Sequence, residues 1–231
     1  VTDTLGAKLT AYYNDDEGWF ENEFTGDDFG AIEQTMVRPV IVWNPDDDVE
    51  LVLRYEYSET KGDGPAAQSH TNRSGVPGTP VNHDRDDFDF NIDEAGFQDT
   101  ETHFVAAELN WAVGENGTIT NIFGWRDFES SALSDIDAQP VSLFHATIGL
   151  EAKQVSNELR YNTILADKAN VTTGIYYFNN DMSYSEGRQL LGALTPDGSP
   201  ASTQDGGGLY EVETWGAFFS VDYDLTESWI L

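Results

Sequence analysis

The sequence contains no cysteine, so disulfide scaffolds and thiolate metal sites are excluded. It has no apolar run near the roughly 18 residues that a membrane-spanning helix needs, which excludes a helical membrane protein. Basic residues are scarce: 11 Lys and Arg stand against 42 Asp and Glu, for a formal net charge of -31. A surface this acidic repels phosphate backbones, so no nucleic-acid partner is expected.

The start of the chain lacks the basic region and apolar stretch of a secretory leader. At the other end, residues 229–231 resemble the beginning of a further strand. Both ends are therefore expected to be cuts within a longer protein.

What the sequence does have is a strong alternation of apolar and polar residues. Along residues 155–165, for example, Leu159 and Tyr161 alternate with Glu158 and Arg160. Successive side chains of a strand point to opposite sides, so this pattern predicts a ribbon with one apolar and one polar face. Eight such strands are predicted, at residues 4–13, 31–43, 49–60, 101–113, 118–130, 152–165, 171–183 and 211–223.

The predicted strands are long, and the links between them alternate in length. Most strands exceed the roughly five or six residues of a typical globular strand and match the about 9–11 residues that cross a bilayer at a tilt. Short turns and long links in alternation are typical of outer-membrane barrels. We therefore predict an all-β, antiparallel up-and-down meander that forms part of a transmembrane β-barrel. The long links are expected at residues 14–30, 61–100, 131–151 and 184–210.

If the apolar faces meet lipid, the polar faces share one interior. The charged residues expected to face that lumen are Arg54, Glu56, Glu108, Arg126, Glu158 and Arg160. In a wide barrel they would line a wet lumen, in a small closed barrel they would form a packed ion-pair network, and in a soluble sandwich they would be the solvent face. Aromatic girdles are expected at both membrane interfaces. Their members would be Trp43, Trp111 and Tyr223 beside short turns, and Tyr57, Trp125 and Tyr177 nearer the long links.

One residue fits this pattern poorly. Pro39 lies inside the second predicted strand and has no N–H to give to a ladder. We expect it to mark a β-bulge.

No catalytic motif is apparent, so an enzyme is not expected. The histidines form no His-x-x-x-His pair, and no Gly-x-Ser-x-Gly motif is present. The sequence has four histidines, His70, His83, His103 and His145. Three of them lie in the predicted long links or at a link edge, so exposed loop positions are the simplest interpretation.

The most acidic segment, residues 84–101, alternates oxygen-bearing side chains as a calcium loop does. Ile92 stands where an EF-hand needs glycine, so loose binding of divalent cations is expected rather than a specific metal site, and no cofactor is predicted. The side chains concerned are Asp87, Asp89, Asn91 and Asp93.

Several short motifs, in order along the chain, resemble strands and loops of TonB-dependent outer-membrane receptors. They are Glu17 to Asn22 with Thr25-Gly26, Val37 to Asp47, Ser156 to Arg160, Gly174 to Phe178, and Glu213 to Phe218. The resemblance implies a barrel of about 22 strands closed by a plug. Residues 1–231 would be part of that single β-barrel domain, about a third of its wall, with no plug domain and no TonB-contacting box.

The resemblance also implies a function. The chain would belong to an active-transport receptor in the outer membrane of a Gram-negative bacterium, taking up a siderophore, a cobalamin-like ligand or an oligosaccharide. Its partners would be membrane lipid, a small molecule bound by extracellular links 61–100 and 184–210, and TonB through a missing N-terminal region. Two alternatives remain open: a complete eight-stranded barrel acting as an adhesin or small porin, and a soluble all-β carbohydrate-binding module.

Overall fold

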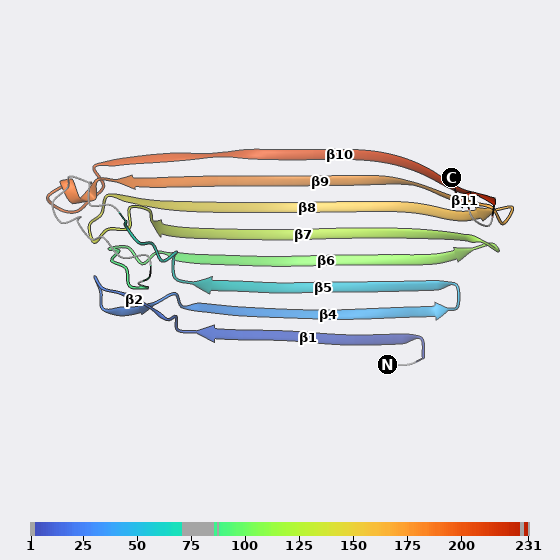
Figure 1. Cartoon of the computed structure of the whole chain (residues 1–231), viewed down its shortest axis with the longest axis horizontal. Helices are drawn as coiled ribbons and strands as arrows, with labels where there is room; N and C mark the ends of the chain where they lie inside the picture. Colours follow the sequence, from blue (N-terminus) through green and yellow to red (C-terminus); the bar gives the residue numbers. More distant parts are fainter. Residues whose placement is uncertain (1–2, 71–85, 87, 227–228, 231) are drawn as a thin grey trace.

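A computed structural model describes residues 3–70, 86, 88–226 and 229–230. It consists of one antiparallel sheet in which each long strand pairs with the next one along the chain (Figure 1). The eight long strands are β1 (Leu5–Asp16), β4 (Ile32–Asp46), β5 (Val49–Gly62), β6 (Phe97–Val113), β7 (Gly117–Asp135), β8 (Phe144–Leu165), β9 (Ala169–Leu190) and β10 (Ser202–Thr226). The meander predicted from the sequence is confirmed.

Short elements lie at the two ends of the strands. A two-stranded hairpin, β2 (Phe20–Asn22) with β3 (Asp27–Phe29), connects β1 to β4, and a 3-10 turn (Gly192–Leu194) lies between β9 and β10. The two-residue strand β11 (Trp229–Ile230) pairs with the end of β10. Among the described residues, no helix is long and apolar enough to span a membrane.

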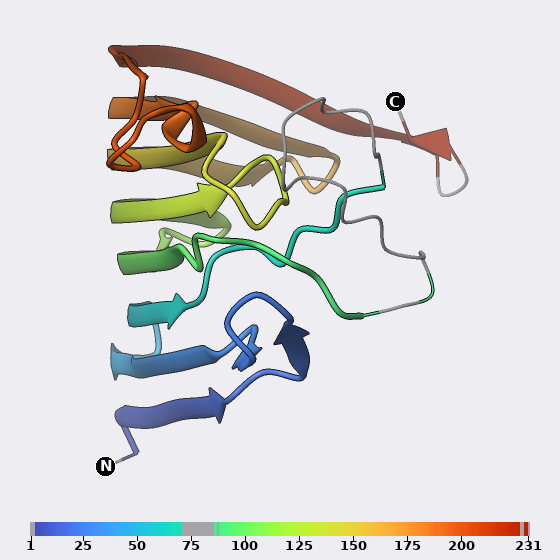
Figure 2. The same ribbon diagram turned by 90° about the vertical axis from the view of Figure 1, so that its left-hand side faces the viewer.

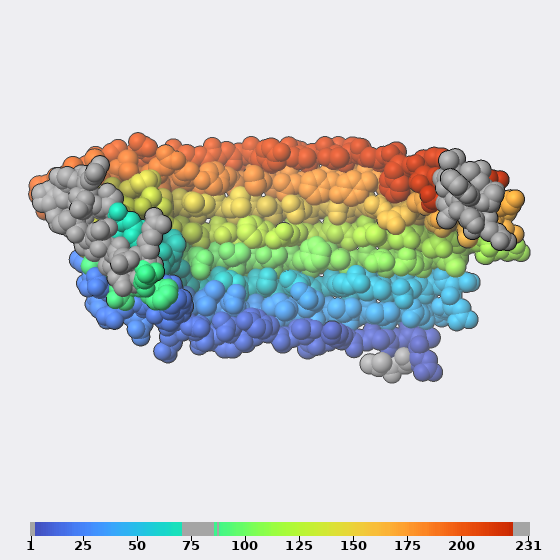
Figure 3. Space-filling model, in the orientation of Figure 1, coloured from blue at the N-terminus to red at the C-terminus, as the bar shows by residue number. Residues whose placement is uncertain are grey.

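The links at the long-loop end hang over one side of the sheet rather than extending its plane (Figure 2). The space-filling view shows the strands packed side by side into a continuous wall, with these links gathered at one end (Figure 3). The molecule therefore has a plain end with short turns and a decorated end, which we call the rim.

β7, β8, β9 and β10 run at least five residues further toward the rim than predicted, and this corrects two of the long links. β7 continues to Asp135 and β8 begins at Phe144, so the link predicted at 131–151 is only 136–143. Likewise, β9 and β10 reduce the link predicted at 184–210 to 191–201. The extensions of β7, β9 and β10 lack a continuous apolar face, so the alternation that reveals a strand is weak in them. The extension of β8 does alternate, with Phe144, Ile148 and Leu150 on one face and polar residues on the other, so its sequence indicates a strand.

The prediction of a bulge at Pro39 is wrong. Pairing with β1 continues through Pro39, which lies opposite Leu9. The ladder with β5 skips Arg38 and Pro39 and resumes in the same register; its one shift lies near the turn, between Trp43 and Asp46. Because Pro39 has no N–H to donate, the pairing between β4 and β5 is interrupted there, but the register is the same on both sides of the gap.

Constant register gives the sheet two consistent faces. In every pair of neighbouring long strands, odd-numbered residues lie opposite odd-numbered residues, as Tyr57, His103 and Asp127 illustrate across three strands. Paired residues point to the same side of a sheet. We call the two sides the odd face and the even face.

Among the described residues, the hydrophobic core lies at the rim links. It consists of the buried residues Phe29, Phe90, Ile92 and Ala138, with Phe20 and Ala67 packed against it. Within the described part of the chain, the other buried apolar side chain is Val52. The large apolar residues of the strands are instead left exposed on a single layer.

The extended β7–β8 pairing can be tested with engineered cysteines, since the sequence has none of its own. Ala132 lies directly opposite Ile148, so Cys at both positions should be joined by oxidation or by a short thiol crosslinker. The matched control pair, at 132 and 150, is diagonal and about 7–8 Å apart. We expect non-reducing gels to show much less joining in the control; equal joining in both would mean that 131–151 is a flexible link.

Candidate functional site

The odd face carries a wide band without charge. On each of the eight long strands, the odd-face residues are uncharged from the short-turn end up to the first charged residue. On β5 this stretch runs from Val49 to Tyr57, which at about 3.3 Å per residue is about 26 Å. The first charged odd-face residues on successive strands are Asp15, Glu33, Glu59, Glu101, Asp127, Lys153, Asp181 and Glu213. We call the uncharged stretch the apolar band.

The side chains of the apolar band are exposed despite their size. Leu9 and Phe219 are each 70% exposed, and Ile175 is 53% exposed. All six residues predicted for aromatic girdles lie on this face, at its two margins. On neighbouring strands, the rings of Tyr177 and Trp215 are in contact, with centroids 4.5 Å apart and planes tilted by 47°.

The even face is charged over the same stretch. All six residues predicted to face a lumen lie on it, since each has an even number in a sheet of constant register. Arg54 pairs with Glu108 at 3.8 Å, and Arg160 donates to Glu158 with an Nε–Oε1 distance of 2.9 Å. Arg126 lies over the ring of Phe128, 5.2 Å from its centroid. The residues predicted as lumen and girdle are therefore sorted onto opposite faces.

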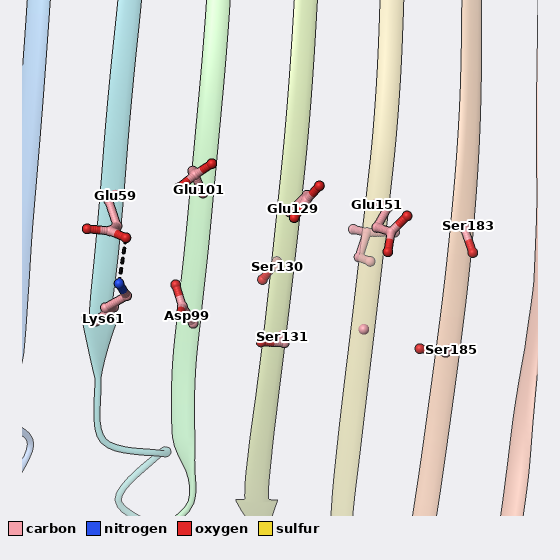
Figure 4. A pocket seen from close by; sticks show the side chains of 12 residues that line it. Glu59, Lys61, Asp99, Glu101, Glu129, Ser130, Ser131, Glu151, Ser183 and Ser185 are labelled. Carbon is pink, nitrogen blue, oxygen red and sulfur yellow. Dashed lines mark hydrogen bonds and ion pairs between the residues drawn. The ribbon is translucent and has the colours of Figure 1, made fainter.

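Beyond the apolar band, the odd face becomes a shallow acidic groove (Figure 4). The groove has a volume of about 380 Å³ and spans five strands. Lys61 is its one basic side chain and binds Glu59 at 2.6 Å. The acidic side chains that line it are Glu59, Asp99, Glu101, Glu129 and Glu151. The excess of carboxylates makes this part of the wall a surface for water and cations.

At the rim, a buried asparagine holds two distant segments together. The Asn22 side chain donates from Nδ2 to the Ile92 carbonyl at 3.0 Å and accepts from the Ile92 N–H at 3.2 Å. This amide therefore pairs with one backbone unit as a neighbouring strand would. It positions Phe90 and Ile92 in the rim core, while Asp63 accepts from the N–H groups of Gly30 and Ala31 at 2.9 Å each.

A second polar cluster lies where β7 ends and β8 begins. Ligand-type atoms of Asp93, Asp135 and His145 all lie within 4.8 Å of one another. His145 Nε2 is 3.2 Å from Asp93 Oδ1 and 3.9 Å from Asp135 Oδ2. Asp137 is close by and accepts from the N–H groups of Leu143 and Phe144.

Burial perturbs the titration of this cluster, which lies beyond the apolar band. Burial, followed by the charge of Asp137, raises the pKa of Asp135 to about 7. Burial also raises the pKa of Asp137. The hydrogen bond with Asp93 raises the pKa of His145. The cluster therefore contains more negative charge than its buried position tolerates without a counter-charge.

The prediction of exposed loop histidines is wrong for His145, which is buried at the start of β8. His103 is half-buried in β6, with Nδ1 2.7 Å from the Tyr55 hydroxyl. His70 is exposed, and His83 lies outside the described residues.

The four residues predicted to bind cations loosely are not gathered at one point. Asp87 lies outside the described residues, and Asp89 is exposed. Asn91 donates to Glu23 at 3.4 Å, whereas Asp93 joins Asp135 and His145. Within the described part of the chain, only Asp93 of the four belongs to a cluster with the spacing of metal ligands.

The wall resembles solved uptake receptors. No family model and no curated protein matches the sequence. Among solved structures, the chain is similar to the ferric-catecholate import receptor Fiu from E. coli K12, with 12% identity, a TM-score of 0.54, and coverage of 98% of this chain and 49% of that one. It is also similar to the RagAB peptide importer, with 10% identity, a TM-score of 0.51, and coverage of 97% and 29%.

A third similar structure is the ferric yersiniabactin uptake receptor FyuA from Yersinia pestis, with 13% identity, a TM-score of 0.43, and coverage of 98% of this chain and 41% of that one. The chain thus spans less than half the length of these receptors. At such low identity the likeness concerns the fold alone: a section of barrel wall like that of outer-membrane import receptors.

The role of Asn22 in holding two rim segments together can be tested with Asn22→Asp. The substitution keeps the acceptor oxygen but replaces the donor with a buried carboxylate facing the Ile92 carbonyl, so we expect a loss of about 1–3 kcal/mol in the free energy of unfolding of the rim. Hydrogen exchange should accelerate at the backbone N–H groups of Phe90 and Ile92. Exposed Glu21→Gln is the control; equal exchange rates in both variants would contradict the role of Asn22.

Proposed function

We propose that this chain is part of the wall of an outer-membrane active-transport receptor of the TonB-dependent type. In this proposal the odd face meets lipid and the even face borders a wet lumen. The rim then lies outside the cell. The single observation that carries the proposal is the apolar band, which is free of charge on all eight strands and exposed on one face only.

Energetics favour lipid over water against this face. Leaving a large apolar side chain in water forgoes roughly 1.5–3 kcal/mol of burial free energy, and many such side chains are exposed side by side here. The band has the length of about 9–11 residues with which a tilted strand crosses a bilayer, and its margins carry aromatic residues, as the lipid-facing side of an outer-membrane barrel does. The charges of the even face would be costly in hydrocarbon but are suited to a hydrated interior.

Two observations weigh against the alternatives. In the described part of the chain, β1 and β10 do not pair with each other, so the sheet is open and not a closed eight-stranded barrel. A soluble sandwich would cover its apolar face with a second layer, and none of the described residues forms one. In a membrane, the edges at β1 and β10 would have to pair with further strands.

The proposed mechanism is binding and gated passage, without bond breaking. Ligand contact would fall to the rim links 63–96 and 191–201, in place of the longer links predicted from the sequence. A siderophore, a cobalamin-like ligand and an oligosaccharide all remain within the proposal. Energy would reach the receptor through TonB, in contact with a region outside this chain.

The orientation of the faces can be tested with a matched pair of arginine substitutions. Leu159 on the odd face is 44% exposed and Ile122 on the even face is 38% exposed, on neighbouring strands. If the odd face meets lipid, Leu159→Arg should cost about 2–4 kcal/mol of folding free energy in lipid vesicles. Ile122→Arg should cost little, because it would lie opposite Glu158 in a wet lumen.

The measurement is denaturant unfolding of the full-length protein in vesicles, followed by heat-modifiable gel mobility. A larger loss for Ile122→Arg would reverse the faces and overturn the proposal. Stability in solution without detergent would favour a soluble module. Monomeric, heat-modifiable insertion of residues 1–231 alone would favour the small closed barrel.

The transport role itself can be tested in the bacterium that carries the gene. Deleting the gene should abolish growth on one scarce nutrient, such as a ferric siderophore, cobalamin or a glycan, and a tonB deletion should abolish the same growth. Replacing link 191–201 with a Gly-Ser link should weaken ligand binding while leaving the barrel in the membrane. Unchanged uptake across a panel of such nutrients would rule out the receptor role.

A further inference from the structure

The buried cluster at the start of β8 is unlike the other charged groups of the chain. The described ion pairs of the even face and the acidic groove are partly exposed to water. In this cluster, by contrast, the Asp135 side chain is 0% exposed and that of His145 is 8% exposed. Water therefore does little to stabilise the carboxylate of Asp135.

Two carboxylate oxygens of the cluster are buried without a hydrogen-bond partner. Asp135 Oδ2 is buried and accepts no hydrogen bond, although it points toward His145 at 3.9 Å. Asp137 Oδ1 is also buried without a hydrogen-bond partner, while its Oδ2 is occupied by two backbone N–H groups. Buried acceptors without partners are rare in folded proteins, and a bound water or cation would satisfy them.

No basic side chain supplies the missing positive charge. Among the described residues, neither Lys nor Arg forms an ion pair with Asp93, Asp135 or Asp137. The imidazole of His145 faces both Asp93 and Asp135 and can balance at most one of their charges. A net negative charge therefore remains in a buried position.

We propose that Asp93, Asp135 and His145 bind a divalent transition-metal ion, with Asp137 close enough to support it. The imidazole nitrogen and two carboxylate oxygens already lie within 4.8 Å of one another. Two ligand atoms that each lie about 2.0–2.2 Å from one Zn²⁺ are at most about 4.4 Å apart. The three atoms are therefore close to the required spacing, and small side-chain rotations would bring them onto one ion. Ca²⁺ prefers oxygen ligands alone, so the histidine favours a transition metal.

The ion would join parts of the rim that are far apart in sequence. Asp93 belongs to the link between β5 and β6, whereas Asp135 ends β7 and His145 lies in β8. Metal binding would thus fix the 63–96 link against the β7–β8 strand ends. This role concerns the architecture of the rim and does not depend on which nutrient, if any, the protein transports.

Zinc binding to the full-length protein, purified in detergent without a histidine tag and stripped with a chelator, tests this proposal. Calorimetric titration with Zn²⁺ should show a site that is weakened more than about 100-fold by Asp135→Asn and by His145→Gln, since even groups behind the ligands alter affinity 10–100-fold. Asp47→Asn, in an exposed turn, and His103→Gln, on a strand away from the cluster, are the matched controls and should leave the titration unchanged.

A thermal measurement separates metal binding from a general loss of folding. Zn²⁺ should raise the Tm of the unmodified protein and of both controls, but not that of Asp135→Asn or Asp93→Asn. Without metal, Asp135→Asn should melt at or above the Tm of the unmodified protein, because a neutral amide removes the buried charge. Preference for Ca²⁺ over Zn²⁺, or Zn²⁺ binding that persists in Asp135→Asn and His145→Gln, would overturn the proposal.

Discussion

The backbone ladder of eight antiparallel strands, with its local gap between Pro39 and β5, is the constraint on which the rest of this structure depends. Because the register stays constant from β1 to β10, side-chain direction is set by whether a residue number is odd or even. A slip of one residue anywhere would carry charged side chains into the apolar band. The ladder also satisfies the backbone N–H and C=O groups within the sheet, which a chain surrounded by hydrocarbon needs.

The same ladder explains what the sequence could and could not predict. Where one face is apolar and the other charged, as around Leu159 and Glu158, the alternation is strong, and all eight strands were predicted from it. At the start of β8 the alternation continues through residues 144–151, and the prediction of a link there is wrong. In β9, by contrast, both faces become polar toward the rim, and residues 184–190 resemble a loop although they continue the strand. A strand surrounded by water on both sides carries no amphipathic signal. The wrong bulge at Pro39 has a related origin, since propensity cannot show that neighbouring pairs hold the register.

The rim residues were harder to predict because their neighbours are distant in sequence. Nothing near Asn22 indicates that its amide pairs with Ile92, and nothing near His145 indicates burial against Asp93. The acidic pattern around 87–93 grouped Asp93 with its neighbours in sequence, whereas the fold places it beside Asp135 and His145. In an extended segment, alternate side chains point to opposite sides, so Phe90 and Ile92 enter the core and their odd-numbered neighbours do not.

The wall and the rim are therefore stabilised in different ways. Along the apolar band, each strand from β4 to β9 pairs with a long strand on both sides, and the side chains need only a suitable solvent on each face. At the rim, the links leave the sheet and are stabilised by contacts with one another. Among the described residues, the core formed there contains four buried apolar residues. The side chains of Asn22 and Asp63 fix the positions of the rim segments, because each forms hydrogen bonds with two backbone groups. Buried carboxylates fit the same pattern only if their charge is balanced, and three of them around one imidazole are not balanced by the described side chains. A cation bound at this cluster would balance the charge of the carboxylates. It would also hold the rim segments together, which the small rim core does only in part.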